Sequence, residues 1–459
     1  MSNDHLMFHV NSLTTLNGML KLSNVAQQKG FKCTLLIENH VNYSGNTSKI
    51  FLGKNSEGSL SLIRRTISPY LPPFLKSLYQ KQKKYFNFYK YEGVYHEKRV
   101  NLLINIHKIK EQEILKLLQN NMPKKIYLAG DRHDGYELAI LKVAKQLKIR
   151  IIIPPIAEKV GYEGPLLQRR KNLNYGIIVT EDITFKKKYK NIWMHDKVSK
   201  EDISFYPKWD VVAKEKCGVL PKNPWIIGSS GNLICAHGEL EKKLIINDGV
   251  DPDNIIVTGH LDHDILYDIF ANKKKNKLRK NLYSKYSLNP NKPMILIGVP
   301  QLLEHFMMPA EEHWTFQETL CKESTKTNSN ILLSLHPKMR YNDYKFLQNK
   351  YQVKIISEKI TEILPLSDIY LGIHGSSTIP LALLCEIPII ILDPVELNYT
   401  IYDWIKSKFV IKDLSNLFST LNTLINDKKI LKEIKLAHKS QKNSVSPFDG
   451  KCQDRIFNI

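Results

Sequence analysis

The chain has 459 residues, of which 42% are hydrophobic and 24% are charged. This length exceeds what one ordinary hydrophobic core organises, so we expect two or three domains, and this composition argues against a disordered chain. The formal net charge of +22 favours anionic partners such as nucleotide diphosphates, acidic glycans, anionic lipid or nucleic acid. It selects among partners and says nothing about the fold.

Six cysteines are spread along the chain without the CxxC or Cys/His spacing of a metal site. The start, MSNDHLMFHVNS, is polar and lacks the charged and then apolar regions of a secretory signal. No stretch reaches the roughly 18 uninterrupted apolar residues that a spanning helix needs. We therefore expect a cytoplasmic protein with unpaired thiols, whose membrane contact would be peripheral, at the inner face of the plasma membrane.

Apolar runs followed by helical patterns recur along the first part of the chain. The run HLMFHV (5–10) predicts a strand, a helical stretch ends at Gly30, and CTLLIE (33–38) predicts the next strand. Residues 124–155 predict a strand, a polar turn, a helix and a strand. Residues 232–270 predict a strand, a helix, a second strand and the start of another helix.

Three segments interrupt this alternation. Residues 54–100 mix Lys with aromatic residues without a clean period, and we interpret them as a solvated insertion. The alternative is a membrane-surface or acceptor-binding element, because aromatic and Lys side chains together suit a lipid headgroup layer. Residues 165–230 are polar with few strong elements. The lysine-dense stretch 269–292 ends in turn residues, and we interpret it as a linker between domains.

Beyond this linker, apolar runs at 294–300, 330–337 and 353–357 again alternate with helical stretches. Continuous apolar runs are typical of parallel strands that are covered on both faces. We therefore predict an α/β class with two doubly wound Rossmann-like domains facing a central cleft. The predicted parts are an N-terminal domain, a C-terminal domain and a tail that crosses back to the first domain: 1–268, 293–430 and 431–459.

The stretch YLGIHGSSTIPLALLCEIPIIILD (370–393) predicts one strand–helix–strand unit of this sheet. It reads as a buried strand, a small polar turn, a helix from Ile379 to Glu386 and a second buried strand. Hydroxyl and backbone N–H groups at such a turn suit a phosphate, and an ordinary Ser/Thr helix cap is the alternative. The candidate phosphate-binding residues here are His374, Gly375, Ser376, Ser377 and Thr378.

A second candidate phosphate contact lies directly after the strand ILLSL. There His336 and Lys338 flank Pro337, which stops the strand, and both side chains can donate hydrogen bonds to a phosphate. A histidine that only caps the strand end is the alternative. Because ligands of open α/β sheets bind at the carboxyl ends of strands, this position and the small polar turn are expected to face one site.

Candidate catalytic residues follow a strand of the first domain, in the sequence AGDRHDG (129–135). Asp131, His133 or Asp134 would accept a proton from an attacking hydroxyl across the cleft. The alternative is a turn in which Asp and Gly supply local hydrogen bonds.

The sequence GHLDHD (259–264) contains His and Asp, the residue types of metal sites. We interpret it instead as a loop in which Asp264 is the N-cap of the next helix, and we name no metal site.

These motifs resemble the GT-B superfamily of nucleotide-sugar enzymes. The segment 130–155 is similar to the GD turn and helix of hydrolysing nucleotide-sugar 2-epimerases, and 234–266 is similar to their segment ending in TGN…D. LSLHPK (333–338) and 364–393 resemble the His-Pro and Ser-Ser motifs of bacterial sialyltransferase-like and polyglycerol-phosphate-transferase-like enzymes. In those families the two motifs hold the donor's nucleotide phosphates.

The resemblance implies a GT-B-like, metal-independent glycosyltransferase that needs no cofactor beyond its nucleotide-sugar donor. Its acceptor would be a bacterial surface polysaccharide, a lipooligosaccharide or a similar glycan or glycolipid. Two departures limit the assignment. GVPQLLEHFMMP (298–309) stands where the epimerases have an Arg-Arg-Glu-Asn-like stretch, and Leu381 lies near the position of a ribose-binding Glu in many transferases.

Several alternatives remain open on sequence alone. A hydrolysing nucleotide-sugar 2-epimerase would act on the nucleotide sugar without an acceptor, and a CDP-polyol phosphotransferase would share the same phosphate motifs. A catalytically silent protein that binds sugar nucleotides or serves as a scaffold is a further alternative. Nucleic-acid binding is disfavoured, because the lysines are dispersed and no nucleic-acid motif is present.

Overall fold

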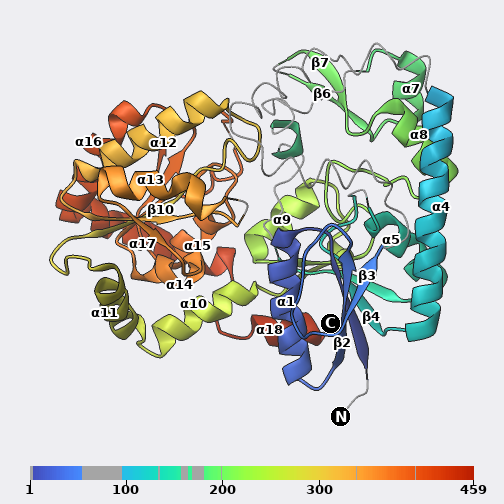
Figure 1. The fold of residues 1–459 in the computed structure, drawn as a ribbon, viewed down its shortest axis with the longest axis horizontal. Helices are drawn as coiled ribbons and strands as arrows, with labels where there is room; N and C mark the ends of the chain where they lie inside the picture. The colour runs from blue at the N-terminus through green and yellow to red at the C-terminus, as the bar shows by residue number, and fades with distance from the viewer. Residues whose placement is uncertain are drawn as a thin grey trace.

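The computed structural model describes residues 4–53, 96–132, 135–156, 164–167, 180–197, 199–337, 339–398 and 400–459. They form two lobes, and each lobe is built around one parallel β-sheet with helices packed against it (Figure 1). The prediction of an α/β protein with two Rossmann-like domains is confirmed. Within the described ranges, no helix is both long enough and apolar enough to cross a membrane.

The first sheet has seven strands in the order β3-β2-β1-β4-β5-β8-β9. The strands are β1 (His5–Val10), β2 (Lys32–Glu38), β3 (Lys49–Leu52), β4 (Lys125–Tyr127), β5 (Arg150–Ile153), β8 (Leu233–Ala236) and β9 (Ile255–Val257). The chain between them forms α1 (Leu13–Gln28), α4 (His96–Asn121), α5 (Glu137–Gln146), α9 (Glu239–Asn247), η3 (Pro252–Asn254) and α10 (Leu261–Ala271). Of the predicted insertion 54–100, residues 54–95 lie outside the described ranges.

Part of the segment that sequence analysis described as having few strong elements is a small folded unit. It contains α7 (Ile183–Lys188), the antiparallel pair β6 (Trp193–Asp196) and β7 (Glu201–Ser204), and α8 (Lys208–Lys216). These elements share their own core, which includes Phe185, Ile203, Phe205, Val211 and Trp225. The expectation of few elements was therefore wrong for 183–216, where an aromatic core stabilises short polar strands.

The second sheet has six strands in the order β12-β11-β10-β13-β14-β15. They are β10 (Met294–Gly298), β11 (Asn330–Ser334), β12 (Lys354–Ile356), β13 (Ile369–Ile373), β14 (Ile389–Leu392) and β15 (Lys408–Ile411). The helices are α12 (Ala310–Thr325), α13 (Tyr341–Tyr351), α14 (Ile360–Ile363), η4 (Leu364–Leu366), α15 (Thr378–Leu384), η5 (Leu414–Asn416), α16 (Leu417–Asn426) and α17 (Lys428–Val445).

Alternate residues of the second sheet point into different cores. Met294 and Leu296 of β10 belong to one hydrophobic cluster, whereas Ile295 and Ile297 belong to another. Burial on both faces explains why the strands read as continuous apolar runs. The strand order reverses between β10 and β13, and open α/β sheets bind ligands at such a reversal.

The predicted linker 269–292 contains a helix, α11 (Lys275–Tyr286). Its Leu282 and Tyr283 are buried in the core of the second domain, and Arg279 donates to both carboxylate oxygens of Asp368 at 2.9 and 2.6 Å. The lysine-dense sequence arises because only one face of α11 is buried. This helix packs as part of the second domain.

The C-terminal segment crosses back to the first domain. Helix α17 packs against α15 of the second domain and α9 of the first, and α18 (Cys452–Phe457) then lies beside α1 (Figure 1). Ile456 and Phe457 are buried with β1 and Tyr127 in the core of the first domain.

The prediction that Asp264 caps α10 was wrong. The N-cap of α10 is His260, whose Nδ1 accepts from the backbone N–H of Asp262 at 3.0 Å. Asp264 lies inside α10, and its carboxylate accepts from the backbone N–H groups of Cys452 and Gln453 at 3.0 and 3.1 Å. Its hydrogen bonds therefore hold the start of α18 against the first domain.

Candidate functional site

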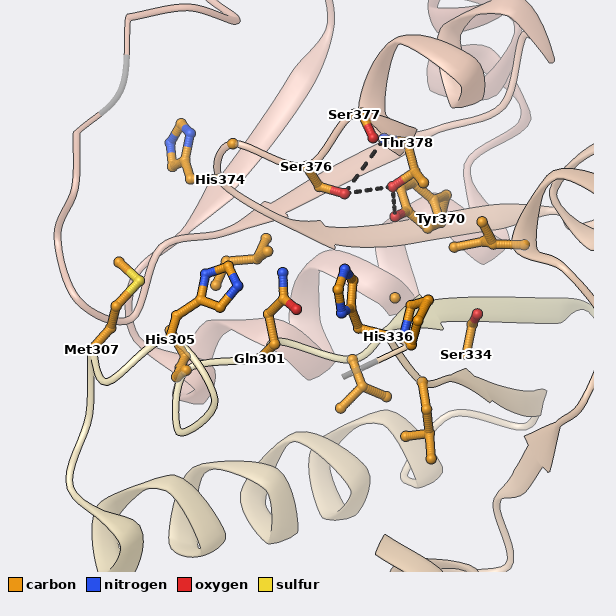
Figure 2. Close-up of a pocket in the computed structure, with 18 of the residues that line it drawn as sticks. Gln301, His305, Met307, Ser334, His336, Tyr370, His374, Ser376, Ser377 and Thr378 are labelled. Atoms are coloured by element: carbon orange, nitrogen blue, oxygen red, sulfur yellow. Dashed lines mark hydrogen bonds between the residues drawn. The ribbon is translucent and has the colours of Figure 1, made fainter. Parts of the chain in front are cut away.

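A cavity of about 230 Å³ lies at the carboxyl ends of β10, β11 and β13, where the order of the second sheet reverses (Figure 2). We call it the strand-end cavity. Its lining comes from the loop after β10, the loop after β11 and the turn between β13 and α15. Such pockets typically measure about 300–1,000 Å³ when they hold a whole small ligand, so this one matches part of a larger molecule.

Three hydroxyl groups line one wall of this cavity, and we call Tyr370, Ser376 and Thr378 the hydroxyl cluster. Thr378 Oγ1 lies 2.7 Å from Ser376 Oγ and also shares a hydrogen bond with Tyr370 Oη (Figure 2). The three groups carry three hydrogens, and these two bonds use two of them. One O–H hydrogen therefore remains for a ligand oxygen.

Tyr370 was not among the predicted site residues, because it lies within a buried apolar strand. Burial raises the pKa of Tyr370 to about 12, so its hydroxyl keeps its hydrogen at neutral pH. Two glycines make room for this group. A Cβ atom at Gly298 or Gly372 would lie only 2.7 or 2.8 Å from Tyr370 Oη.

The turn before α15 is fixed by its own backbone. Gly375 has φ of +81°, a conformation that favours glycine, and Ser376 N donates to Ile373 O at 3.1 Å. Ile379 N donates to Ser376 O at 3.1 Å, and Tyr402 Oη donates to the same carbonyl at 2.7 Å. The N–H of Ser376, expected to face a phosphate, is therefore used within the turn, and hydroxyl groups face the cavity instead.

The predicted helix of this unit is displaced by a residue or two. Helix α15 begins at Thr378 and ends at Leu384, whereas the sequence pattern predicted Ile379 to Glu386. Ser377 lines the cavity and is exposed. The structure thus brings all five predicted residues, His374 to Thr378, to the cavity lining.

His336 reaches the same cavity from the loop after β11. The loop closes through Met339 N, which donates to His336 O at 2.8 Å. The two predicted motifs, separated by one strand and its helices in sequence, therefore meet at one site. Lys338, the other predicted phosphate contact of this motif, lies outside the described residues.

His374 lines the cavity but is largely buried, with 7% of its surface exposed. Its ring stacks on Tyr402 with an interplanar angle of 13°, and its Nε2 lies 3.9 Å from a carboxylate oxygen of Asp393. Burial lowers the pKa of His374 despite the neighbouring carboxylates, so the ring is neutral at neutral pH. It supplies a wall and a neutral imidazole to the cavity, with no positive charge.

Asp131 does not face an open cleft. It is only 1% exposed, and its carboxylate accepts hydrogen bonds from Gly228 N at 3.0 Å, Ser230 N at 2.9 Å and Ser230 Oγ at 2.6 Å. These bonds tie the end of β4 to the loop before β8. The geometry explains Asp131 as a structural residue, and the other two candidate bases, His133 and Asp134, lie outside the described residues.

The loop after β10 also lines the cavity, through Gln301, His305 and Met307. In the sequence, this loop stood out only because it lacks the arginines expected of an epimerase. The sequence did show that His305 follows a predicted strand by five residues. Whether its side chain points into the cavity depends on the turn that follows the strand, which the sequence did not reveal.

A second cavity, of about 190 Å³, lies between the domains, and we call it the interdomain cavity. Lys21 of α1 and Asp262 of α10 form an ion pair in its lining, and Pro337 comes from the second domain. Burial opposes ionisation, but the charges of His260 and Lys21 hold the pKa of Asp262 below its ordinary value. Pro337 lines both cavities, so the two adjoin.

No group of three or more His, Cys, Asp or Glu side chains in the described ranges is arranged to hold a metal ion.

No protein-family model and no curated protein sequence matches this chain. Among solved structures, it is similar to a putative UDP-N-acetylglucosamine 2-epimerase from Listeria monocytogenes, with a TM-score of 0.52 and 12% identity over 99% of this chain and 95% of that one. It is also similar to the wall teichoic acid polymerase TagF, with a TM-score of 0.53 and 11% identity over 100% and 88% of the two chains.

A third similar structure is the spinosyn rhamnosyltransferase SpnG complexed with thymidine diphosphate, with a TM-score of 0.51 and 10% identity over 99% of this chain and 100% of that one. These structures are GT-B-type nucleotide-sugar enzymes, and the predicted resemblance to that superfamily is confirmed at the level of structure. At such low identities the similarity shows the fold: this chain has a GT-B fold.

Proposed function

We propose that this chain is a metal-independent GT-B glycosyltransferase that moves a sugar from a nucleotide-sugar donor to a bacterial surface glycan or glycolipid. The observation that carries the proposal is the strand-end cavity, where His336 and the hydroxyl cluster meet at the reversal of the second sheet. The similar structures add support, since they include a putative UDP-N-acetylglucosamine 2-epimerase and a rhamnosyltransferase complexed with thymidine diphosphate.

The proposed chemistry stabilises a leaving phosphate. As the bond between sugar and phosphate breaks, negative charge grows on the phosphate oxygens, and hydrogen-bond donors held in advance lower the energy of that state. His336 and the remaining hydroxyl hydrogen of the hydroxyl cluster would supply such donors. Lys338 follows two residues after His336, and we propose it as a further phosphate contact. These groups would stabilise the negative charge that a bound metal ion stabilises in other transferases.

The acceptor would approach from the first domain through the interdomain cavity. That cavity adjoins the strand-end cavity at Pro337 and offers the paired charges of Lys21 and Asp262 to polar groups of a glycan. A base must take the proton of the attacking hydroxyl. With Asp131 buried and fully engaged, His133 and Asp134 remain the proposed bases.

A hydrolysing nucleotide-sugar 2-epimerase is the second candidate, favoured by the structural similarity to the Listeria monocytogenes protein. The loop after β10 argues against it, because this loop presents Gln301 and His305 where the epimerases were expected to carry arginines. A polyol-phosphate transfer, suggested by the similarity to TagF, would use the same phosphate contacts.

A thermal-shift panel of CMP, CDP, UDP, TDP and GDP tests the shared part of the proposal. A nucleotide that binds only the folded chain raises the melting temperature by mass action. At a nucleotide concentration of 100 times Kd it adds about 2.7 kcal/mol to the free energy of unfolding. The panel should yield one or two selective shifts that disappear in His336→Ala. No shift with any nucleotide at millimolar concentration would refute the assignment of the cavity.

Product analysis then separates the reactions. The sugar nucleotide that matches the selected base is incubated alone and with a glycan acceptor. A transferase consumes the donor at speed only when acceptor is present, whereas a hydrolysing epimerase releases nucleotide and an altered free sugar without one. Transfer of a polyol phosphate from a CDP-polyol would identify the third reaction.

A further inference from the structure

Helix α17 carries most of its positive charge on one exposed face. Its 18 residues include six lysines and one glutamate. Four of these lysines are separated by four, three and four residues, so they form one stripe along the helix, and all four are exposed. The residues that α17 buries lie on a different face: Ile434, His438 and Val445. We give the name lysine face to Lys428, Lys432, Lys435 and Lys439.

The lysine face has no acidic partner in the part of the chain that the structure describes. Lys442, further along α17, pairs with Glu386 at 3.4 Å, but none of the four lysines lies within ion-pair distance of a carboxylate there. Other exposed lysines of the second domain do pair, such as Lys350 of α13 with Glu318 at 2.8 Å. Like charges three or four residues apart on a helix repel each other. A surface of opposite charge would relieve this repulsion.

The shape and chemistry of the lysine face fit a flat anionic surface. Its four lysines follow one another along about 16 Å of helix, so a planar surface can meet all of them at once. Leu436 is 59% exposed and lies four residues after Lys432, at the edge of the lysine face. An exposed apolar side chain beside lysines suits the boundary between lipid headgroups and acyl chains. Single-stranded nucleic acid instead stacks on aromatic side chains, and α17 has none.

We propose that the lysine face binds the anionic surface of a lipid bilayer, with Leu436 entering the headgroup layer. Each lysine held near an anionic leaflet strengthens binding about fivefold. The attraction extends over about one Debye length, which is about 10 Å at 0.1 M salt. The contact would bring the chain close to a glycolipid acceptor, but it does not require that the chain be a transferase.

The test is sedimentation of the full chain with two sets of vesicles, one of pure phosphatidylcholine and one with about one third phosphatidylglycerol. Wild type should bind only the anionic vesicles and should dissociate in about 1 M salt, where the Debye length falls to about 3 Å. Changing all four residues of the lysine face to glutamine should weaken binding about tenfold or more. Leu436→Ser should weaken it severalfold.

A matched control removes the same amount of charge from the first domain. It changes four exposed lysines to glutamine and should bind anionic vesicles within about twofold of wild type: Lys145, Lys187, Lys190 and Lys216. Glutamine and lysine have similar helix propensity, and melting temperatures establish that both variants fold. Nucleotide affinity should be the same in both variants as in wild type, so this test is separate from that of the proposed function.

Three results would overturn the inference. Wild type that binds no anionic vesicles would do so, and so would equal losses in the lysine-face variant and the control, because total charge would then explain the binding. The third is binding of heparin or polyuridylic acid that depends on the lysine face while vesicle binding does not. Unchanged vesicle binding in Leu436→Ser would overturn the part assigned to Leu436.

Discussion

Tyr370, Ser376 and Thr378 share two hydrogen bonds among three hydroxyl groups, so the direction of each O–H depends on the other two. A ligand that accepts the remaining hydrogen orients the whole chain of bonds, and such chains strengthen one another in a medium of low dielectric constant. Ser376 lies at one end of this chain of bonds. Removing its hydroxyl should therefore weaken ligand binding more than it lowers the stability of the fold.

Ser376→Ala tests this at the ligand. We expect nucleotide affinity to fall about five- to tenfold, because a hydrogen bond to a charged phosphate is lost, while the melting temperature changes little. Titration calorimetry measures the effect. Ser419→Ala removes an exposed hydroxyl on α16 that bonds only locally, to Asn416 O, and serves as the control. Equal affinities of Ser376→Ala and wild type would place the ligand elsewhere.

Asp131→Asn distinguishes a structural residue from a base. Asparagine has one uncharged acceptor oxygen in place of two charged ones, so the hydrogen bonds from Gly228 and Ser230 become weaker and we expect a loss of about 1–3 kcal/mol in the free energy of unfolding. Urea unfolding measures it, with Asp343→Asn at an exposed ion pair as the comparison. An unchanged unfolding free energy together with lost turnover would restore the catalytic role.

At the scale of elements, Gly298 of β10 and Gly372 of β13 leave the space that the hydroxyl group of Tyr370 occupies between the two strands. Gly298→Ala should cost about 1–3 kcal/mol of stability, because the added Cβ would lie 2.7 Å from Tyr370 Oη and the next contact is at 3.6 Å. Combining it with Tyr370→Phe removes the clashing oxygen and should recover most of this loss.

Gly372→Ala is the matched control for that rescue. Its Cβ would also meet ring carbons of Tyr370, at 2.9 and 3.1 Å, so Tyr370→Phe should not recover its stability. A double-mutant cycle from urea unfolding gives both coupling energies. Equal coupling in the two pairs would contradict the arrangement of β10 and β13 described above.

Burial explains which elements could be predicted from sequence. Strands β1 and β14 are buried along their whole length, and their apolar runs marked them within a residue or two. Strands β6 and β7 are short and polar, and they are held by an aromatic core assembled from distant residues. Their local sequence therefore carried little signal.

The candidate site was predictable in part for a similar reason. His336 and the turn from Gly375 to Thr378 follow recognisable strands, so their meeting at one sheet edge followed from topology. The role of Tyr370 depends on the space left by Gly298, far away in sequence. The place of His305 depends on a turn closed by a residue of positive φ, which no local pattern announced.

For the whole molecule, buried imidazoles predict loss of stability in mild acid. Burial lowers the pKa of five histidines spread over both domains, and that of His313 falls to about 4: His5, His263, His313, His374 and His438. The unfolded chain binds these protons near pH 6.5 and the folded chain does not. Their contribution is complete above pH 6.5 and is lost as the pH falls from 6.5 toward 4.

Urea unfolding at pH 7.5, 6.0 and 5.0 measures how the free energy of unfolding depends on pH. These pH values lie above the range in which ordinary carboxyl groups titrate. His313→Phe should reduce the slope between pH 6.5 and 5.0, whatever it does to stability at pH 7.5. Stability that stays constant from pH 7.5 to 5.0 would show that the imidazoles remain accessible to protons in the folded chain.

The return of α18 to the first domain has a consequence for the order of synthesis. Along the chain, the whole second domain lies between the strands of the first domain and the two residues, Ile456 and Phe457, that complete its core. A ribosome therefore finishes the second domain while the first still exposes the apolar surface of β1 and Tyr127 that α18 will cover. The domain that is translated first becomes complete last, and until then it presents the surface that chaperones recognise.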